Sequence, residues 1–236
     1  MTSILKADLL DEIGRRFKAQ FWFKTFGSIG FMALFFWGYI YILQHAFVLV
    51  TEMPLLAVDR LIPYQNGAWL IYVSLWVYVQ LPVTMIVNRR ELVRYGWSSS
   101  VISIIGFAVF IFWPTAVPLV DVDGVGTLYS AMRNIDTTGN SCPSLHVAFS
   151  VFTAMWLDRF VRWIGGAGWV RWFNVIWCLS IVYSTMATKQ HVLIDVVAGG
   201  ALGYAGGWVQ ARFGGEVREM AAAPDFAQIK PASRKL

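Results

Sequence analysis

Residues 97–118 read Trp-Ser-Ser-Ser-Val-Ile-Ser-Ile-Ile-Gly-Phe-Ala-Val-Phe-Ile-Phe-Trp-Pro-Thr-Ala-Val-Pro, a stretch without a charged side chain. A helix needs about 20 mostly apolar residues to cross the hydrocarbon core of a bilayer. The rest of the chain has the same character, because 57% of its 236 residues are hydrophobic and 14% are charged. A soluble domain carries about 25% charged residues. The stretch therefore predicts a membrane-spanning helix in an integral membrane protein.

Further apolar segments of similar length follow one another with short gaps, which predicts an all-α, polytopic six-transmembrane-helix bundle. The spans are expected near 27–50, 68–87, 97–118, 145–164, 170–188 and 192–211. The fourth and sixth are less apolar than the others, as is typical of helices that carry a site at one end. We expect the bundle to occupy residues 26–211 and the tail, 212–236, to be poorly ordered.

The N-terminal segment, residues 1–25, has a different pattern. Apolar residues recur every four positions at Leu5, Leu9, Ile13, Phe17 and Phe21, and they alternate with Lys6, Arg15, Arg16, Lys18 and Lys24. This pattern favours an amphipathic helix that lies on the membrane surface. A solvated extension of the first span is the alternative.

Lysine and arginine are unevenly distributed between alternate loops, and this predicts the orientation of the chain. The N-terminal segment, the loops at 88–96 and 159–171 and the tail are rich in these residues, whereas the loops at 51–67, 119–144 and 188–191 hold one each. Short cytoplasmic loops carry the excess of positive charge. Both termini are therefore expected in the cytoplasm. Because orientation explains the net charge of +5, no nucleic-acid partner is expected.

Two of the three histidines are expected at the same depth on the non-cytoplasmic side. His146 begins the fourth span, His191 begins the sixth, and Asp195 follows His191 by one helical turn. A carboxylate inside a span indicates a functional site with a partner, and His191 is the nearest partner. Hydrogen bonding to Asp195 would fix one ring nitrogen of His191 and leave the other as a nucleophile. A haem between the two histidines, or a transport role, is the remote alternative.

Two further features of the same helices are predicted. Asp195, Gly199, Gly203 and Gly207 recur every four residues on one face of the sixth span, and small residues at this spacing let helices approach closely. Ser144, just before the fourth span, is a good N-cap residue, and the N-terminus of that helix favours a bound anion. We expect Cys142, close to this motif, to be accessible to thiol reagents from the non-cytoplasmic side.

Residues 140–150 read Asn-Ser-Cys-Pro-Ser-Leu-His-Val-Ala-Phe-Ser, and residues 184–199 read Ser-Thr-Met-Ala-Thr-Lys-Gln-His-Val-Leu-Ile-Asp-Val-Val-Ala-Gly. These stretches resemble the second and third motifs of the type 2 phosphatidic acid phosphatase (PAP2) superfamily, Pro-Ser-x-His and Ser-Arg-x5-His-x3-Asp. A further resemblance, to the branch that includes inositol phosphorylceramide synthases, rests on Ile62-Pro63-Tyr64, Tyr72, Pro82, Asp136 and Asn140.

The chain departs from the family pattern at two cations that hold phosphate. The first motif, Lys-x6-Arg-Pro, is missing, and Thr185 stands where arginine is usual. Lys189 and Arg133 lie on the predicted site side and are the candidate substitutes. Snorkelling to water is the alternative role for Lys189. Together with Ser144 and Ser184 of the motifs, they form the predicted substrate-binding set.

The resemblance implies a two-step phosphoryl transfer on a membrane lipid phosphate. His191 would form a phosphohistidine, Asp195 would orient its ring, and His146 would protonate the leaving oxygen and then activate the incoming molecule. The resemblance implies no metal or other cofactor. Water as the incoming molecule gives a lipid phosphatase, which is the first choice because water needs no acceptor pocket. An alcohol such as inositol gives a lipid phosphotransferase.

Overall fold

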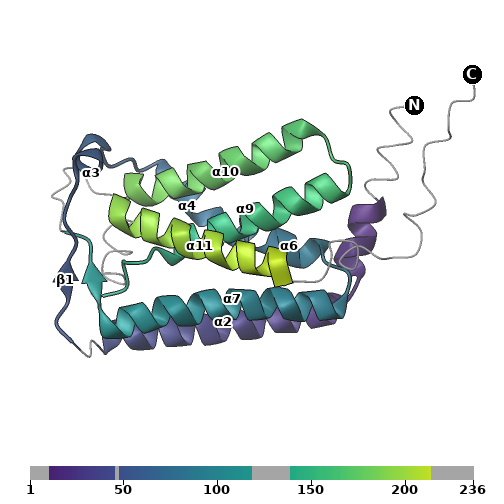
Figure 1. The fold of residues 1–236 in the computed structure, drawn as a ribbon, viewed down its shortest axis with the longest axis horizontal. Helices are drawn as coiled ribbons and strands as arrows, with labels where there is room; N and C mark the ends of the chain where they lie inside the picture. Colours follow the sequence, from purple (N-terminus) through teal and green to yellow (C-terminus); the bar gives the residue numbers. More distant parts are fainter. Residues whose placement is uncertain (1–10, 46–47, 119–138, 214–236) are drawn as a thin grey trace, which may run out of the picture.

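The computed structural model describes residues 11–45, 48–118 and 139–213, which are mostly helical, as expected (Figure 1). Residues 11–18 form a first helical segment. The labelled helices are α2 (Phe21–Gln44), α3 (Ala57–Leu61), α4 (Ala68–Val73), α5 (Leu75–Tyr78), α6 (Gln80–Met85), α7 (Arg89–Phe112), α9 (Leu145–Trp163), α10 (Gly168–Ala187) and α11 (Leu193–Phe213). Two short strands, β1 (Thr51–Glu52) and β2 (Thr115–Ala116), were not expected.

Among the described residues, three helical stretches are long and apolar enough to cross a bilayer: Phe21–Gln44, Ala68–Met85 and Arg89–Phe112. They correspond to the first three predicted spans. The helices α9, α10 and α11 coincide with the other three predicted segments and are 19, 20 and 21 residues long. Several apolar helices thus fit a membrane protein, and the six-span arrangement stays a prediction.

The second predicted span is interrupted, which its hydropathy does not reveal. It divides into α4, α5 and α6, with breaks at Ser74 and Val79. Pro82 has no N–H to donate to the carbonyl four residues earlier, and this weakens the helix just after Tyr78. The Ser74 hydroxyl donates to the Ile71 carbonyl (2.6 Å), a type of hydrogen bond that bends helices.

The third helix begins and ends earlier than the predicted range of 97–118. The Asn88 side chain accepts a hydrogen bond from the Arg90 N–H (2.8 Å) and caps α7 at its start. Pro114 follows Trp113, the C-cap residue, and cannot continue the helix. The chain then extends into β2 rather than completing another helical turn.

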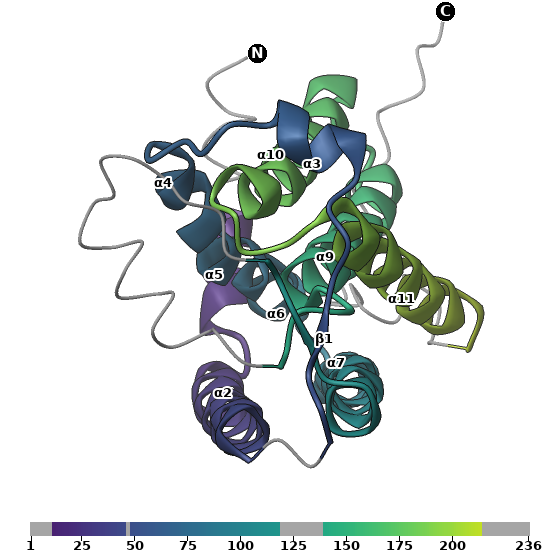
Figure 2. The ribbon, with the colours of Figure 1, turned by 90° about the vertical axis from the view of Figure 1, so that its left-hand side faces the viewer.

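Successive long helices alternate in direction, so one end of the bundle collects the starts of α9 and α11 and the ends of α2, α7 and α10 (Figure 1). The parallel pair β1 and β2 crosses this end between α2 and α7 (Figure 2). The pairing joins Thr51 to Thr115 and Glu52 to Ala116. An isolated bridge between Thr115 and Asn140 extends it toward the start of α9.

The N-terminal segment bends where a continuous helix was expected, because Gln20 adopts a left-handed conformation (φ 56°) just before α2. Residues 1–10 lie outside the described part. Ile13 and Phe17 are exposed, as an apolar face toward lipid requires, but Arg16 and Lys24 are buried. The Arg16 guanidinium donates to the Met85 carbonyl (2.9 Å), and the Lys24 ammonium donates to the carbonyls of Arg16 (2.8 Å) and Thr84 (2.9 Å).

Candidate functional site

The start of α9 is held in place by β2. Thr115 Oγ1 accepts hydrogen bonds from the Cys142 N–H (2.8 Å) and the Ser141 hydroxyl (3.0 Å). Ser144 then caps α9 through its hydroxyl, which accepts from the Val147 N–H at 3.3 Å. His146 therefore lies in the first turn of α9, at the end of the bundle where the strands cross.

The start of α11 is positioned by a tight turn after α10. The Thr185 carbonyl accepts the N–H groups of Gln190 (3.0 Å) and His191 (3.1 Å), and Lys189 has a left-handed backbone (φ 58°). These contacts hold His191 just ahead of α11. The Asp195 carboxylate accepts the Val192 N–H at 3.0 Å, so it also caps the helix on which it lies.

The two histidines face each other across the starts of α9 and α11. Their ring centroids are 6.1 Å apart, with an interplanar angle of 54°. Nδ1 of His191 lies 3.5 Å from Oδ2 of Asp195, which is slightly longer than an ordinary hydrogen bond. Asp195 is fully buried, and His191 is 7% exposed. This geometry leaves Nε2 as the His191 nitrogen that can face a substrate.

His146 is surrounded by aromatic rings from α4 and α5. The Tyr72 ring stacks on it at 4.3 Å, and Trp76 lies edge-on at 6.1 Å. The Tyr72 hydroxyl lies 3.4 Å from His146 Nδ1. Nε2 of His146 is buried and has no hydrogen-bond partner within the described residues. That nitrogen is therefore available to exchange a proton with a bound molecule.

Close packing of α9 against α11 brings these residues together, as the small-residue stripe predicts. A Cβ atom on Gly199 would lie 2.3 Å from the Ser144 carbonyl oxygen, and one on Gly203 would lie 2.2 Å from that of Ala148. The Ser144 N–H donates to the Asp195 backbone carbonyl at 3.0 Å. No side chain larger than hydrogen fits at Gly199 or Gly203 without movement of a backbone.

The other predicted substrate-binding residues are Ser184, Lys189 and Arg133, and the first two differ in their hydrogen-bond partners. The Ser184 hydroxyl is buried and donates to the Ile181 carbonyl (2.7 Å) within its own helix. The Lys189 ammonium donates to the backbone carbonyls of Asp59 (2.9 Å) and Ile62, next to α3. Burial lowers the pKa of Lys189, and the Asp59 carboxylate opposes that shift. Arg133, like Asp136 of the weaker resemblance, lies outside the described residues.

Asp59 is a buried carboxylate at the site that the sequence did not single out. One of its oxygens accepts the N–H of Leu56, the N-cap residue of α3, and the other accepts the Leu193 N–H at the start of α11, both at 2.8 Å. Two carboxylates, those of Asp59 and Asp195, therefore lie at the positive end of the α11 dipole. The only signal in the sequence was the position of Asp59 in a loop on the predicted site side.

Cys142 is not accessible, contrary to expectation. It is 4% exposed. Burial, the charge of Asp195 and a hydrogen bond to Asp195 raise the pKa of its thiol to about 12. A thiolate is the reactive form of cysteine, so Cys142 is a poor target for alkylating reagents at neutral pH.

The remaining candidates do not extend the site. His45 caps the end of α2, where its Nδ1 lies 2.8 Å from the Tyr41 carbonyl. In the part of the chain that the structure describes, no cluster of three or more histidine, cysteine, aspartate or glutamate side chains could hold a metal ion. The arrangement offers instead one nitrogen that can act as a nucleophile and a second that can exchange a proton.

Comparison with known proteins agrees with the motifs of the two helices. A sequence model described as the PAP2 superfamily matches residues 39–209. The match includes both histidines, Asp195 and the α9–α11 pair. Searches of curated proteins and of solved structures found no significant match. Since the family model covers most of the chain and contains the whole site, the chain belongs to the PAP2 superfamily.

Proposed function

We propose that this protein is an integral membrane lipid phosphatase that hydrolyses a lipid phosphate ester through a phosphohistidine on His191. Membership of the PAP2 superfamily points to a phosphatase-type enzyme. The observation that carries the proposal is the pairing of His146 with His191, whose rings are 6.1 Å apart with Asp195 beside His191. A phosphoryl group between the rings could meet a nucleophile and a proton donor at once.

The reaction begins with in-line attack of His191 Nε2 on phosphorus. A neutral ring with the proton on Nδ1, directed at Asp195, leaves the Nε2 lone pair free, and the Asp195 carboxylate stabilises the positive charge that develops. The bond from phosphorus to the lipid oxygen breaks as the new P–N bond forms. His146, protonated on Nε2, gives its proton to the leaving oxygen, a contribution of roughly 10²–10⁴ in rate.

The second step releases phosphate from the enzyme. Neutral His146 takes a proton from water as the water oxygen attacks phosphorus, and the P–N bond breaks to restore His191. Backbone N–H groups at the start of α9, with the Ser144 hydroxyl, are the proposed donors to the phosphoryl oxygens. Lys189 is the proposed cation, because the two carbonyls beside α3 use only two of its three donors.

The side of the membrane follows from the proposed topology. Six spans, with an N-terminal amphipathic helix and both termini in the cytoplasm, place the starts of α9 and α11 on the periplasmic, exterior or lumenal side. The lipid can then keep its chains in the bilayer while its phosphate reaches the histidines. Withdrawing the chains into water would cost about 0.8 kcal/mol for each exposed CH₂ group.

Transfer to an alcohol is the second candidate. A cluster of Tyr64, Trp69 and Tyr72 adjoins His146, with the Trp69 N–H donating to the Tyr64 hydroxyl at 3.1 Å. The Tyr72 hydroxyl, 3.4 Å from Nδ1 of the proposed general base, and the Tyr64 hydroxyl of the same cluster could orient a polyol acceptor such as inositol. The cluster would support the phosphotransferase if addition of an alcohol acceptor changed the lipid product.

One assay tests the proposal and separates the two candidates. Purified protein is incubated with a panel of lipid phosphates, with and without inositol, and both free phosphate and the lipid products are measured. The phosphatase releases phosphate without an acceptor, retains its activity in excess EDTA, and is inhibited by vanadate. An inositol-containing lipid product with little free phosphate would identify the phosphotransferase, and loss of activity in EDTA that magnesium restores would overturn the mechanism.

A further inference from the structure

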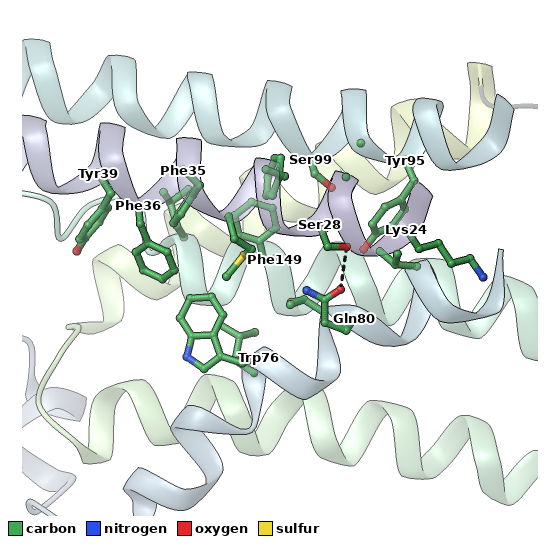
Figure 3. A pocket seen from close by; sticks show the side chains of 18 of the residues that line it. Lys24, Ser28, Phe35, Phe36, Tyr39, Trp76, Gln80, Tyr95, Ser99 and Phe149 are labelled. Carbon is green, nitrogen blue, oxygen red and sulfur yellow. Dashed lines mark hydrogen bonds between the residues drawn. The ribbon is translucent and has the colours of Figure 1, made fainter. Parts of the chain in front are cut away.

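A large cavity lies beside His146, between α2, the broken helix α4–α6, α7 and α9. Its volume is about 750 Å³, within the usual range for ligand pockets. Most of its lining is aliphatic or aromatic, with Phe35, Phe36 and Phe149 among the side chains that point into it (Figure 3). His146 and its stacking partner Tyr72 also belong to the lining. An apolar chamber thus adjoins one of the proposed catalytic side chains.

The cavity runs along α2 and meets polar groups far from His146. Figure 3 shows Tyr39 and Lys24 at opposite ends, with Ser28 and Gln80 nearer Lys24. The Ser28 hydroxyl donates to the Gln80 side-chain oxygen at 3.4 Å, from α2 to α6. The Lys24 ammonium is turned away toward the carbonyls of Arg16 and Thr84. Polar side chains of Ser28 and Gln80 therefore lie toward the Lys24 end of the cavity, among apolar lining residues such as Phe23 and Leu92.

Helix geometry gives the depth of this polar end. Tyr39 and Ser28 are eleven residues apart on α2, which corresponds to about 16 Å at about 1.5 Å per residue. Tyr72 and Gln80 are eight residues apart along α4–α6, or about 12 Å. Half of a bilayer's hydrocarbon core is about 15 Å thick. The Ser28–Gln80 pair thus lies about one leaflet below the histidines.

We propose that this cavity binds one hydrocarbon chain of the substrate lipid, and that the hydrogen-bonded pair Ser28 and Gln80, about one leaflet below His146, limits the length of that chain. The inference rests on the proposed function, since it needs a lipid whose phosphate lies at His146. A chain that is too short leaves part of the cavity empty and loses dispersion contacts. A chain that is too long pushes methylene groups against the Gln80 amide and breaks its hydrogen bond to Ser28.

Two glycines in the lining allow the cavity to be shortened without a clash. A Cβ atom added to Gly27 on α2 or to Gly96 on α7 meets no heavy atom within 4 Å. A leucine at either position can therefore extend into the cavity. Gly30 provides the matched control, because a Cβ atom there is equally unobstructed and Gly30 is not part of the lining. All three substitutions make the same gain in helix propensity.

The test measures kcat/KM for lipid phosphates of one headgroup with chains from about half to the full length of a leaflet. Gly27→Leu and Gly96→Leu should each lower kcat/KM for the longest chains by roughly tenfold and move the optimum to shorter chains. Gly30→Leu should keep the wild-type profile. Two variants on different helices keep the test informative if one of them fails to fold.

The outcomes separate this inference from the proposed function. If wild-type protein releases phosphate, but both cavity variants keep its chain-length profile, the cavity does not hold the chain and the inference is wrong. If wild-type protein releases no phosphate from any lipid, the proposed function fails first. A lipid phosphate with a photoreactive diazirine at its chain end then gives a second readout. Crosslinks near Ser28 and Gln80 that Gly27→Leu abolishes would support chain binding, and crosslinks only on the outer faces of the helices would refute it.

Discussion

Replacing Gly199 with alanine should test whether close packing of α9 and α11 holds the site together. The added Cβ atom would lie 2.3 Å from the Ser144 carbonyl oxygen. An ordinary contact needs about 3.5 Å, so the two backbones must separate by about 1 Å at the level of Asp195 and Ser144. The hydrogen bond between the Ser144 N–H and the Asp195 carbonyl, now 3.0 Å long, lies at the same point.

The effects on stability and on activity should differ in size. Overpacking costs about 1–3 kcal/mol, and alanine in place of glycine in a helix offsets about 1 kcal/mol of that. The net loss of stability is thus about 0–2 kcal/mol. A displacement of about 1 Å between catalytic groups can cost 10²-fold in rate. We therefore expect Gly199→Ala to remain folded and to lose roughly 10²-fold in kcat.

Gly200→Ala is the matched control, since its Cβ atom would lie 4.0 Å from the nearest atom, in Val147. It should retain wild-type activity and gain slightly in stability. The assay is phosphate release from the best lipid phosphate of the panel, with thermal unfolding of each variant measured in the same detergent. A Gly199→Ala protein with wild-type kcat and an unchanged Tm would refute the reasoning, because the helices would then tolerate the separation.

Further substitutions test the proposed nucleophile, the hydrogen bonds of Lys189 and the orientation in the membrane. His191→Ala should abolish phosphate release without unfolding the protein, and more than a tenth of wild-type activity would exclude His191 as the nucleophile. Lys189→Met should lower the Tm, because the carbonyls of Asp59 and Ile62 lose their donor. Lys189→Arg should restore part of the lost Tm. An unchanged Tm in Lys189→Met would show that these hydrogen bonds do not stabilise α3. In intact cells at pH 8, an impermeant maleimide should label Leu49→Cys. It should not label Ala167→Cys, which lies on the opposite side of the membrane in the proposed topology. The reverse labelling pattern would show that the proposed orientation is inverted. The native Cys142 and Cys178 are buried, and the raised pKa of Cys142, about 12, keeps its thiol protonated at that pH.

The sequence was sufficient to predict most of the helices and the family. Long apolar runs have few stable conformations other than helix, because a backbone in lipid must satisfy its hydrogen bonds within the same segment. The predicted segments therefore agree with α2, α4–α6, α7, α9, α10 and α11, apart from shifts at their ends. The family was predicted from two short motifs that contain His146, His191 and Asp195, and the family model that matches residues 39–209 confirms it.

Contacts between distant segments could not be predicted in this way. Asp59 caps α11 from the short helix α3, more than a hundred residues earlier, and no local pattern marks such a partner. The hydrogen bonds from the Lys189 ammonium to the carbonyls of Asp59 and Ile62 are also contacts that no local pattern indicates. The burial of Arg16, Lys24 and Cys142 likewise depends on which helices pack around them.

The sequence by itself determined which residues could carry the chemistry, because residue type and helical spacing fix which side chains share a helix face and an end of a span. Only the tertiary structure decided how far apart His146 and His191 lie, and that a 750 Å³ apolar cavity begins beside His146. Both depend on how closely the helices pack against one another. The absence of a side chain at Gly199 allows α9 and α11 to touch, whereas bulky rings on α2 and α9 and the broken helix α4–α6 border the cavity.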